Sequence, residues 1–483
     1  MTTIDFGRAR AALGDLPAGT SHGETPAPEQ VYLPRSHVRA MDPDAQLVTG
    51  MRGAGKTFWW RALQQGVVRQ LVAAQRSAVS ESTEVRIGFG ERPALDQYPG
   101  KDVLRSLIDD EGFQPRIIWR TVHAWQLAPD DHPLRQRESW RKRVRFVDTN
   151  PEVTEHLFQE RDEELDRKNV YLLILCDALD RCADDWKEMY RTIRGLLQTA
   201  VDLRSYRRLR VKVFLRSDQI DESRIGDFPD ASKVLSSTVE LNWPRHELYG
   251  LLWHCLANGR IGEVFRGFFQ TGDWPSMTVA EKHVFSVPRP LIVKEEHQRE
   301  KFHALAGRWM GTDRRRGFPY TWIPNHLADT DGRVSPRSFL AALRTAADDT
   351  ADRHSGHETA LHYDSIKLGV QEASRIRVRE LQEDYPWVHR VLSPLGGMVV
   401  PCDFGEIARR WTREGVLDRL AEETEQNEVK LPPLRIDRGA EGVREDLESL
   451  RVFMHMRDGR VNIPDVFRVG YGLGRRGGVR PVQ

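Results

Sequence analysis

Residues 50–57 read GMRGAGKT, and this octapeptide constrains the fold more than any other segment. It matches G-x-x-x-x-G-K-[ST] at every fixed position. Glycines let the backbone curl until successive N–H groups face an anion, and a following helix adds the positive end of its dipole. An apolar stretch (46–50) precedes the loop, and apolar residues at helical spacing (57–75) follow it. The octapeptide therefore predicts a phosphate-binding loop between a strand and a helix.

The loop predicts a nucleoside triphosphate with Mg²⁺ as its ligand, and we expect ATP. Lys56 would reach the β- and γ-phosphates, and Thr57 would ligate the metal. The residues expected to contact the nucleotide are Gly50, Arg52, Gly53, Ala54, Gly55, Lys56, Thr57 and Phe58.

Apolar segments that alternate with helical patterns predict the fold class. The expected strands are 46–50, 84–90, 171–177, 211–216 and 238–243, with a mostly helical insertion over 92–168. The run 171–177 (YLLILCD) is continuously apolar up to its last residue, as in a strand buried on both faces of a parallel sheet. Together these segments predict an α/β fold, the doubly wound parallel sheet of a P-loop NTPase.

At 483 residues, the chain is long enough for about three domains. We expect an N-terminal arm (1–40), a P-loop ATPase core with the helical insertion (41–244), a helical lid (245–350) and a C-terminal domain (351–483). We interpret 288–300 as a loop and the polar stretch 350–359 as a linker.

The C-terminal domain has its own pattern. Helices at 362–382 and 403–423 precede a strand-turn-strand pattern over 452–464, where Asp458-Gly459 is a hairpin signal. Helices followed by a hairpin predict a winged-helix-like domain. The Gly- and Arg-rich tail, 472–483, is predicted to be mobile.

Asp177 stands at the end of the apolar run 171–177. A carboxylate there costs stability unless it is paired or bound to a metal, and in a P-loop protein this position anchors Mg²⁺. The alternative is a helix N-cap. A second acid usually follows directly, but Ala178 occupies that place, so Asp180 is the near candidate to orient the attacking water. A salt bridge to Arg181 is the alternative role for Asp180.

Residues 177–182 (DALDRC) resemble the D-D-L-D-R-C signature of KAP-type P-loop NTPases, which are near the STAND and AAA+ groups. The segment 211–218 (VKVFLRSD) resembles the fourth strand of such bacterial ATPases, and 241–243 (LNW) is similar to their lid entry. The resemblance covers 41–350 and implies an ATPase that couples its nucleotide state to a partner, in a bacterial antiphage or conflict role. Ala178 is its main departure, which puts hydrolysis in question more than binding.

Three sets of arginines are candidates to sense the γ-phosphate, where phosphoryl transfer needs positive charge. Arg216 is at the sensor position of that resemblance, where Asp218 would orient it; a salt bridge at the sheet edge is the alternative. Arg337, after Pro336, resembles the sensor-two arginine of AAA+ lids, against the alternative of a surface arginine. The triplet 314–316 would be a finger acting on a neighbour, although a solvated charge run is the favoured interpretation.

Composition limits the remaining classes. The net charge of +1 gives no global basic field, so the basic clusters 141–145 and 204–212 are interpreted as solvated faces. Four cysteines without a C-x-x-C pair suit a reducing cytoplasm, and no stretch reaches the roughly 20 apolar residues of a membrane span. We therefore expect a cytoplasmic ATPase that acts on a protein partner or as a homo-oligomer. A nucleotide-gated DNA-binding protein (a loader or regulator) and a small-molecule kinase are the alternatives.

Overall fold

The computed structural model describes residues 5–17, 25–75, 79–269, 272–426, 428–476 and 479–481. Within it the chain divides into two compact units. The core unit is Arg35–Asn242, and the composite unit combines Met1–Pro34 with Trp243–Gln483. The finer division into arm, lid and C-terminal domain stays a prediction.

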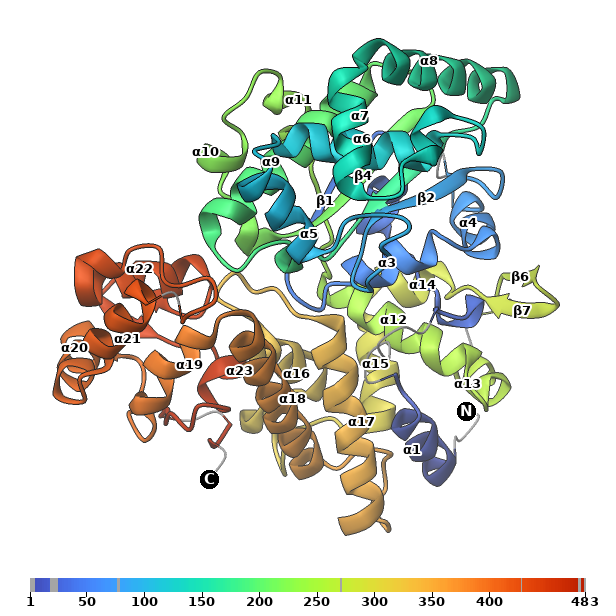
Figure 1. Cartoon of the computed structure of the whole chain (residues 1–483). Coiled ribbons are helices and arrows are strands. Elements are labelled where there is room, and N and C mark those ends of the chain that lie inside the picture. The colour runs from blue at the N-terminus through green and yellow to red at the C-terminus, as the bar shows by residue number, and fades with distance from the viewer. Residues whose placement is uncertain are drawn as a thin grey trace. The chain divides into compact units, whose positions relative to one another are not determined.

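A five-stranded parallel sheet lies at the centre of the core unit, in the order β2-β3-β4-β1-β5 (Figure 1). Its strands are β1 (Leu47–Gly50), β2 (Glu84–Phe89), β3 (Leu172–Cys176), β4 (Leu209–Arg216) and β5 (Val239–Glu240). β1 and β3 are buried along their whole length, as expected of strands covered on both faces. The predicted α/β class is confirmed, although β5 is shorter than the segment 238–243.

Helices surround this sheet, with α6 and α9 packed on each other, α6 against β2 and α9 against β4. The helical elements are η2 (Arg35–His37), α2 (Val38–Met41), α3 (Lys56–Ala62), α4 (Gly66–Ala73), α5 (Lys101–Arg105), η3 (Ser106–Asp110), α6 (Pro115–Leu127), η4 (Pro133–Gln136), α7 (Trp140–Thr149), α8 (Pro151–Lys168), η5 (Leu179–Arg181), α9 (Trp186–Arg204), η6 (Ser217–Gln219), α10 (Glu222–Ile225) and α11 (Ala231–Leu235). The helical insertion is confirmed.

The single helix predicted over 57–75 is wrong, because the chain breaks between α3 and α4, where Arg69 donates to the Leu63 carbonyl at 2.8 Å.

The composite unit is mostly helical and contains two small antiparallel sheets. Its elements are α1 (Phe6–Gly14), η1 (Pro28–Gln30), α12 (Arg245–Asn258), α13 (Gly262–Phe269), β6 (Ser276–Val279), β7 (Lys282–Phe285), α14 (Arg289–Val293), α15 (Glu295–Ala306), η7 (Arg314–Arg316), α16 (Pro319–Leu327), α17 (Pro336–Arg353), α18 (Tyr363–Asp384), α19 (Pro386–Leu392), η8 (Ser393–Leu395), β8 (Cys402–Asp403), α20 (Phe404–Arg413), α21 (Val416–Glu425), η9 (Ile436–Arg438), α22 (Gly439–Ser449), β9 (Met454–His455), β10 (Arg460–Asn462) and α23 (Asp465–Arg468).

The predicted winged-helix-like arrangement is present at the C-terminal end of this unit. The sheet β8-β10-β9 flanks α20, α21 and α22, and β9 and β10 form the predicted hairpin. Gly459 in its turn has φ 84°, a conformation that favours glycine.

The structure differs from three expectations about the composite unit. The segment 288–300 is largely helical, as α14 and α15. The proposed linker 350–359 begins as the last turn of α17, and α17 packs along α18. The predicted mobile tail is anchored in its described part, because Arg468 donates to the carbonyls of Leu473 and Val479, each at 2.8 Å; positions 477, 478, 482 and 483 lie outside the described residues.

The N-terminal arm contains a helix that its sequence did not indicate. Helix α1 packs on α17, and the Arg10 guanidinium donates to the carbonyls of Ser355, Thr359 and Ala360 at 3.0–3.1 Å. One side chain thus ties the start of the chain to the turn between α17 and α18. In the described part of the chain, no helix is long and apolar enough to span a bilayer.

Candidate functional site

The phosphate loop lies where the sequence predicts it, between the end of β1 and the start of α3. Gly53 and Gly55 have φ of 81° and 106°, a region that disfavours side chains. Gly50 is required by space instead, since a Cβ there would meet the Ala54 Cβ at 3.0 Å and the Leu241 Cβ at 3.3 Å. The glycines of the motif therefore serve two purposes, backbone curvature and close approach to β5.

Lys56 is the first residue of α3, and its side chain folds back over the loop. The ammonium donates to the carbonyls of Gly50 at 2.8 Å and Met51 at 2.9 Å. No third acceptor lies within hydrogen-bonding distance among the described residues, so one N–H is left for a ligand. Burial lowers the pKa of Lys56 to about 8, and the positive charge of Arg216 acts in the same direction.

Asp177 follows β3 directly and is 3% exposed. Its carboxylate accepts a hydrogen bond from the Thr57 side chain, while its Oδ2 is buried without a hydrogen-bond partner among the described residues. Burial raises the pKa of Asp177 to about 6, against the opposing effect of the Thr57 bond. An unsatisfied carboxylate oxygen beside a hydroxyl fits Mg²⁺, which takes one or two protein ligands and substrate phosphates. The two predicted metal ligands are thus brought together.

Arg216 ends β4, which lies between β1 and β3 in the sheet. In the β1–β4 register, Arg216 lies opposite Gly50, the first residue of the phosphate loop. The prediction that the strand of Arg216 is adjacent to that loop is therefore confirmed. Its guanidinium binds Asp218 through two hydrogen bonds, Nε to Oδ1 at 3.2 Å and Nη2 to Oδ2 at 2.7 Å. Both side chains are nearly buried, at 11% and 12% exposure, so Asp218 fixes the orientation of the arginine.

The segment after Asp177 is strained. Ala178, in the place of the usual second acid, has φ 57°, a left-handed conformation that costs a residue with a Cβ about 1–2 kcal/mol. Asp180 follows in η5, half-buried, and its charge acts on both Lys56 and Asp177. The salt bridge predicted as an alternative, Asp180 to Arg181, is not what the structure shows for that arginine, because Arg181 pairs with Glu91 at 2.9 Å.

Glu91 is the acid that sequence reasoning missed. It lies two residues beyond β2, the strand beside β3, and also binds Arg61 of α3 at 2.8 Å. A carboxylate is thus held between the helix of the phosphate loop and the segment that follows Asp177. The signal that singled out Asp177, an acid directly after a predicted strand, also holds for Glu91 after the predicted strand 84–90.

The remaining predicted contacts differ in character. In the loop, Ala54 is fully buried, Arg52 is half-buried, and the ring of Phe58 packs edge-on against Trp59 with centroids 5.4 Å apart. Arg337 belongs to the composite unit, where its Nη1 donates to Glu380 at 2.7 Å. A role in sensing nucleotide stays a prediction for Arg337.

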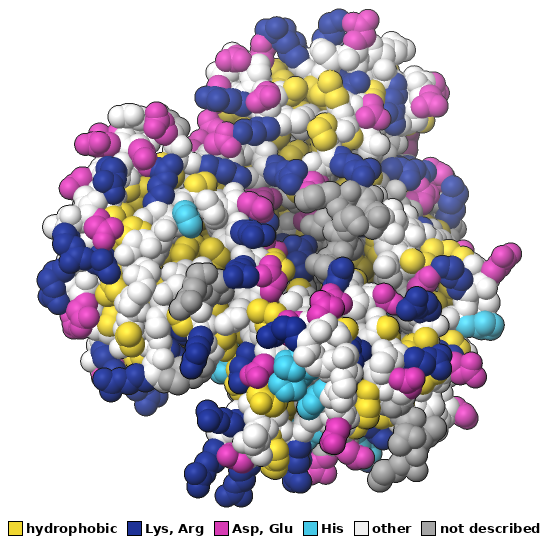
Figure 2. Space-filling view, turned by 90° about the horizontal axis from the view of Figure 1, so that it is seen from below, with side chains coloured by type: hydrophobic (Ala, Val, Ile, Leu, Met, Phe, Trp, Pro, Cys, Tyr) yellow, Lys and Arg dark blue, Asp and Glu magenta, His cyan; other side chains and the backbone are white. Residues whose placement is uncertain are grey.

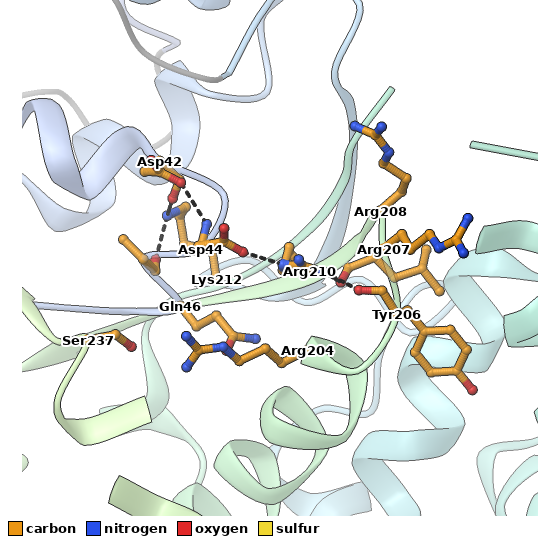
Figure 3. Close-up of polar contacts among 12 residues, drawn as sticks. Asp42, Asp44, Gln46, Arg204, Tyr206, Arg207, Arg208, Arg210, Lys212 and Ser237 are labelled. Atoms are coloured by element: carbon orange, nitrogen blue, oxygen red, sulfur yellow. Dashed lines mark hydrogen bonds and ion pairs between the residues drawn. The ribbon is translucent and has the colours of Figure 1, made fainter. Parts of the chain in front are cut away.

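The basic cluster 204–212 is used internally (Figure 3). Arg210 binds Asp44 at 2.6 Å, as Figure 3 shows. Arg207 and Arg208 both bind Asp166 of α8 at 2.8 Å, outside the view. Lys212 is fully buried and donates to the carbonyls of Ala40 at 2.9 Å, Asp42 at 2.7 Å and Ala45 at 2.6 Å.

The arginines of the cluster 141–145 also contact other residues of the core unit. Arg141 and Arg145 pair with Glu111, and Arg143 stacks over Trp125 at 3.7 Å. On the face seen in Figure 2, acidic and basic side chains are interspersed, in keeping with the net charge of +1.

No protein-family model matches the chain, and no curated protein matches its sequence. Among solved structures, the chain is similar to the Aeropyrum pernix ORC2 protein in ADPNP-ADP complexes, at 13% identity over 92% of each chain with a TM-score of 0.38. It is also similar to Cdc6p from Pyrobaculum aerophilum, at 8% identity over 96% of this chain and 94% of that one, with a TM-score of 0.34. Both scores are low, so the P-loop NTPase fold is assigned from the strand order and phosphate loop described above.

Proposed function

We propose that the chain binds ATP with Mg²⁺ at the edge of the sheet where β1, β3 and β4 end, and hydrolyses it. The observation that supports this proposal is the contact between Thr57 and Asp177 beside the free donor of Lys56. A hydroxyl, a carboxylate and an ammonium are the three groups that hold a triphosphate and its metal in this class of loop.

Each residue has a separate task in this proposal. Lys56 binds the β- and γ-phosphates with its remaining donor, and Thr57 and Asp177 hold the metal. When bound between Thr57 and Asp177, the metal would supply positive charge against the negative charge that develops on the phosphates. Arg216, kept in place by Asp218, contributes positive charge to the γ-phosphate.

Two carboxylates compete for the role of orienting the attacking water. Asp180 is the candidate from sequence, and Glu91 is the candidate from the fold. Glu91 is held by two arginines, Arg61 and Arg181, so it would need to leave one of them to act on water. We propose that Asp180 orients the attacking water. Glu91 instead links α3, the helix of the phosphate loop, to the segment that follows β3.

Phosphate release by Asp180→Asn and Glu91→Gln tests this assignment. Asp180→Asn should keep ATP affinity within about threefold and lower turnover by about 100-fold, the usual scale of a lost general base. Glu91→Gln with turnover abolished and Asp180→Asn with turnover intact would reverse the two roles. Wild-type turnover in both variants, or absence of Mg²⁺-dependent ATP binding in the unaltered protein, would overturn the proposed activity.

We further propose that nucleotide state is coupled to a protein partner or another copy of the chain, with Arg337 as the lid sensor. The likeness of residues 177–182 to the KAP-type signature supports a narrower placement beside the KAP and STAND groups, in a cytoplasmic defence role. Co-purification with and without ATP, using Arg337→Ala and the exposed Arg344→Ala as a matched pair on α17, tests the coupling. Equal capture of partners by both variants would contradict a role for Arg337.

DNA recognition through the winged-helix-like part receives little support from its charges. Helix α22, which precedes the hairpin, carries four acids: Glu441, Glu445, Asp446 and Glu448. Its nearby arginines are paired with these acids, as in Arg438 with Glu445 at 2.6 Å and Arg444 with Glu448 at 2.8 Å. Such a surface offers no excess positive charge to phosphates, so we propose a protein as the partner of this part.

A further inference from the structure

Residues 307–318, which we call the basic loop, join α15 to α16 and carry four arginines against a single acid. The arginines are Arg308, Arg314, Arg315 and Arg316, and all four are exposed. Among the described residues, none of them has an acidic side chain within ion-pairing distance. By contrast, arginines near α22 and three arginines of the cluster 204–212 are paired with acids. The basic loop therefore presents positive charge that the described part of the protein does not neutralise.

The basic loop has a defined structure. The Met310 amide donates to the Gly317 carbonyl at 2.9 Å, which closes the loop at its base, and the Met310 side chain is 1% exposed. The Asp313 carboxylate accepts from the Arg315 amide at 2.7 Å, so the single acid is used to fix the turn η7. The arginines are therefore carried on a turn whose backbone is held in place, so binding needs to order only their side chains.

Aromatic rings lie directly beside these charges. Trp309 and Phe318 are in contact, with ring centroids 4.9 Å apart, and His303 stacks on Phe318 at an interplanar angle of 9°. The Arg308 guanidinium lies 4.8 Å from the centre of a Trp309 ring. Phe318 is 38% exposed, among the few large apolar side chains that the described chain leaves open to solvent.

We propose that the basic loop binds a single-stranded nucleic acid, with its guanidinium groups on phosphates and the Trp309–Phe318 pair against a base. Planar guanidinium forks suit phosphate oxygens, and an exposed ring beside them offers a stacking platform. An acidic peptide would satisfy the arginines but would leave the exposed ring without a stacking partner. The proposal does not rest on ATP binding, because every residue that carries it lies in the composite unit and the phosphate loop lies in the core unit.

Fluorescence anisotropy of the full-length protein with labelled 20-nucleotide single-stranded DNA and RNA, between 50 and 200 mM salt, tests the proposal. The triple variant R314A/R315A/R316A should lower affinity at least about tenfold and reduce the slope of log K against log salt by about 2, since each single-strand phosphate contact contributes about 0.7. Phe318→Ala should weaken binding about tenfold with little change in slope, as expected of a lost stacking contact.

The matched control is R141A/R145A, which removes two exposed arginines that are already paired with Glu111. It should leave affinity within about twofold, and ATP affinity should be unchanged in every variant. Absence of single-strand binding at 50 mM salt, an equal loss in the control, or tighter binding of poly-glutamate than of the oligonucleotides would overturn the proposal. If ATP binding fails while the oligonucleotide results hold, the proposed function is wrong and this inference stands.

Discussion

Two lysines of the core unit, Lys56 and Lys212, are both buried and both donate to backbone carbonyls. Lys212, on β4 near the start of β1, donates to three carbonyls at 2.6–2.9 Å and so uses every N–H of its ammonium. Lys56, at the opposite end of β1, donates to only two. Burial lowers the pKa of both groups, to about 7 for Lys212 and about 8 for Lys56.

The difference lies in the donor that is left over. A lysine with three acceptors has no N–H donor left, so its ammonium can only stabilise the fold. A lysine with two acceptors and the carboxylate of Asp177 nearby keeps one donor for a ligand that brings negative charge. We therefore expect substitutions at Lys212 to change stability and substitutions at Lys56 to change binding.

The largest effect should come from Lys56→Ala. Loss of a charge-assisted contact to two phosphates should weaken ATP binding by at least about 100-fold, or roughly 3 kcal/mol. The free energy of unfolding should fall by no more than about 1 kcal/mol, because the relief from removing a buried ammonium offsets the loss of a donor by only two carbonyls, those of Gly50 and Met51. Calorimetric titration with ATP·Mg²⁺ and urea unfolding measure the two quantities. Unchanged affinity would refute the assignment of the phosphate loop.

Lys212→Met should show the reverse pattern. Three buried carbonyls lose their donor at about 1–3 kcal/mol each, which outweighs the relief from removing a buried charge, so the unfolding free energy should fall by about 2–3 kcal/mol. Affinity for ATP in the folded protein should stay within about threefold. The half-exposed Lys101, paired with Asp184 on the surface, gives the control Lys101→Met, which should change stability by less than about 0.5 kcal/mol. A similarly small change at Lys212 would remove the contrast between the two lysines.

Asp177→Asn should raise stability while it removes the metal site. Because the pKa of Asp177 is raised to about 6 by burial, its ionisation opposes folding above the unfolded value of 3.8, with the full cost present above pH 6. The amide should therefore stabilise the protein by about 1–2 kcal/mol at pH 8 and by progressively less as pH falls from 6 to 4. Thermal unfolding across this range, with and without Mg²⁺, gives the measurement. A loss of stability at pH 8 would mean that the carboxylate is held by partners instead of being poised for a metal.

The smallest effect is the pH dependence of ATP binding. The lowered pKa of Lys56 means that the free protein loses this charge as pH rises through about 8, so affinity should fall by up to about tenfold per unit above that value. Binding at pH 9 should take up close to one proton, which calorimetry in two buffers detects. Lys56→Arg, charged at every accessible pH, should abolish this dependence. A dependence that survives in Lys56→Arg would point to another group.

The parts of the site that local sequence could predict are those coded by contiguous residues. The phosphate loop follows from GMRGAGKT, and Asp177 follows from an acid at the end of an apolar run. Lys212 was grouped with a basic cluster because its acceptors lie about 170 residues away, at Ala40 to Ala45. Glu91, like Asp177, is an acid that follows a predicted strand. The sequence does not single it out, because only the pairing of β2 with β3 brings Glu91 beside the segment that follows Asp177.

The fold shows the same division between features set by contiguous residues and features set by distant contacts. The strands of the sheet could be predicted because each is a short segment in which apolar residues run together, as in β3, or alternate with polar ones, as in β2 and β4. The break between α3 and α4 could not, because it depends on Arg69 reaching the Leu63 carbonyl, a contact that apolar periodicity does not encode. The stretch 350–359 looked like a linker from its polarity, but its carbonyls are bound by Arg10, from the opposite end of the chain.

The contact between Arg10 and Ala360 spans 350 residues, and it sets a delay during synthesis on the ribosome. At about 5–20 residues per second, α1 must wait roughly 20–70 s before its partner turn is made. The whole core unit is translated within that interval and can reach its own native state first. During that interval the phosphate loop is already made while the buried face of α1 still lacks its partner helix, so we expect this to be the period when a chaperone matters most.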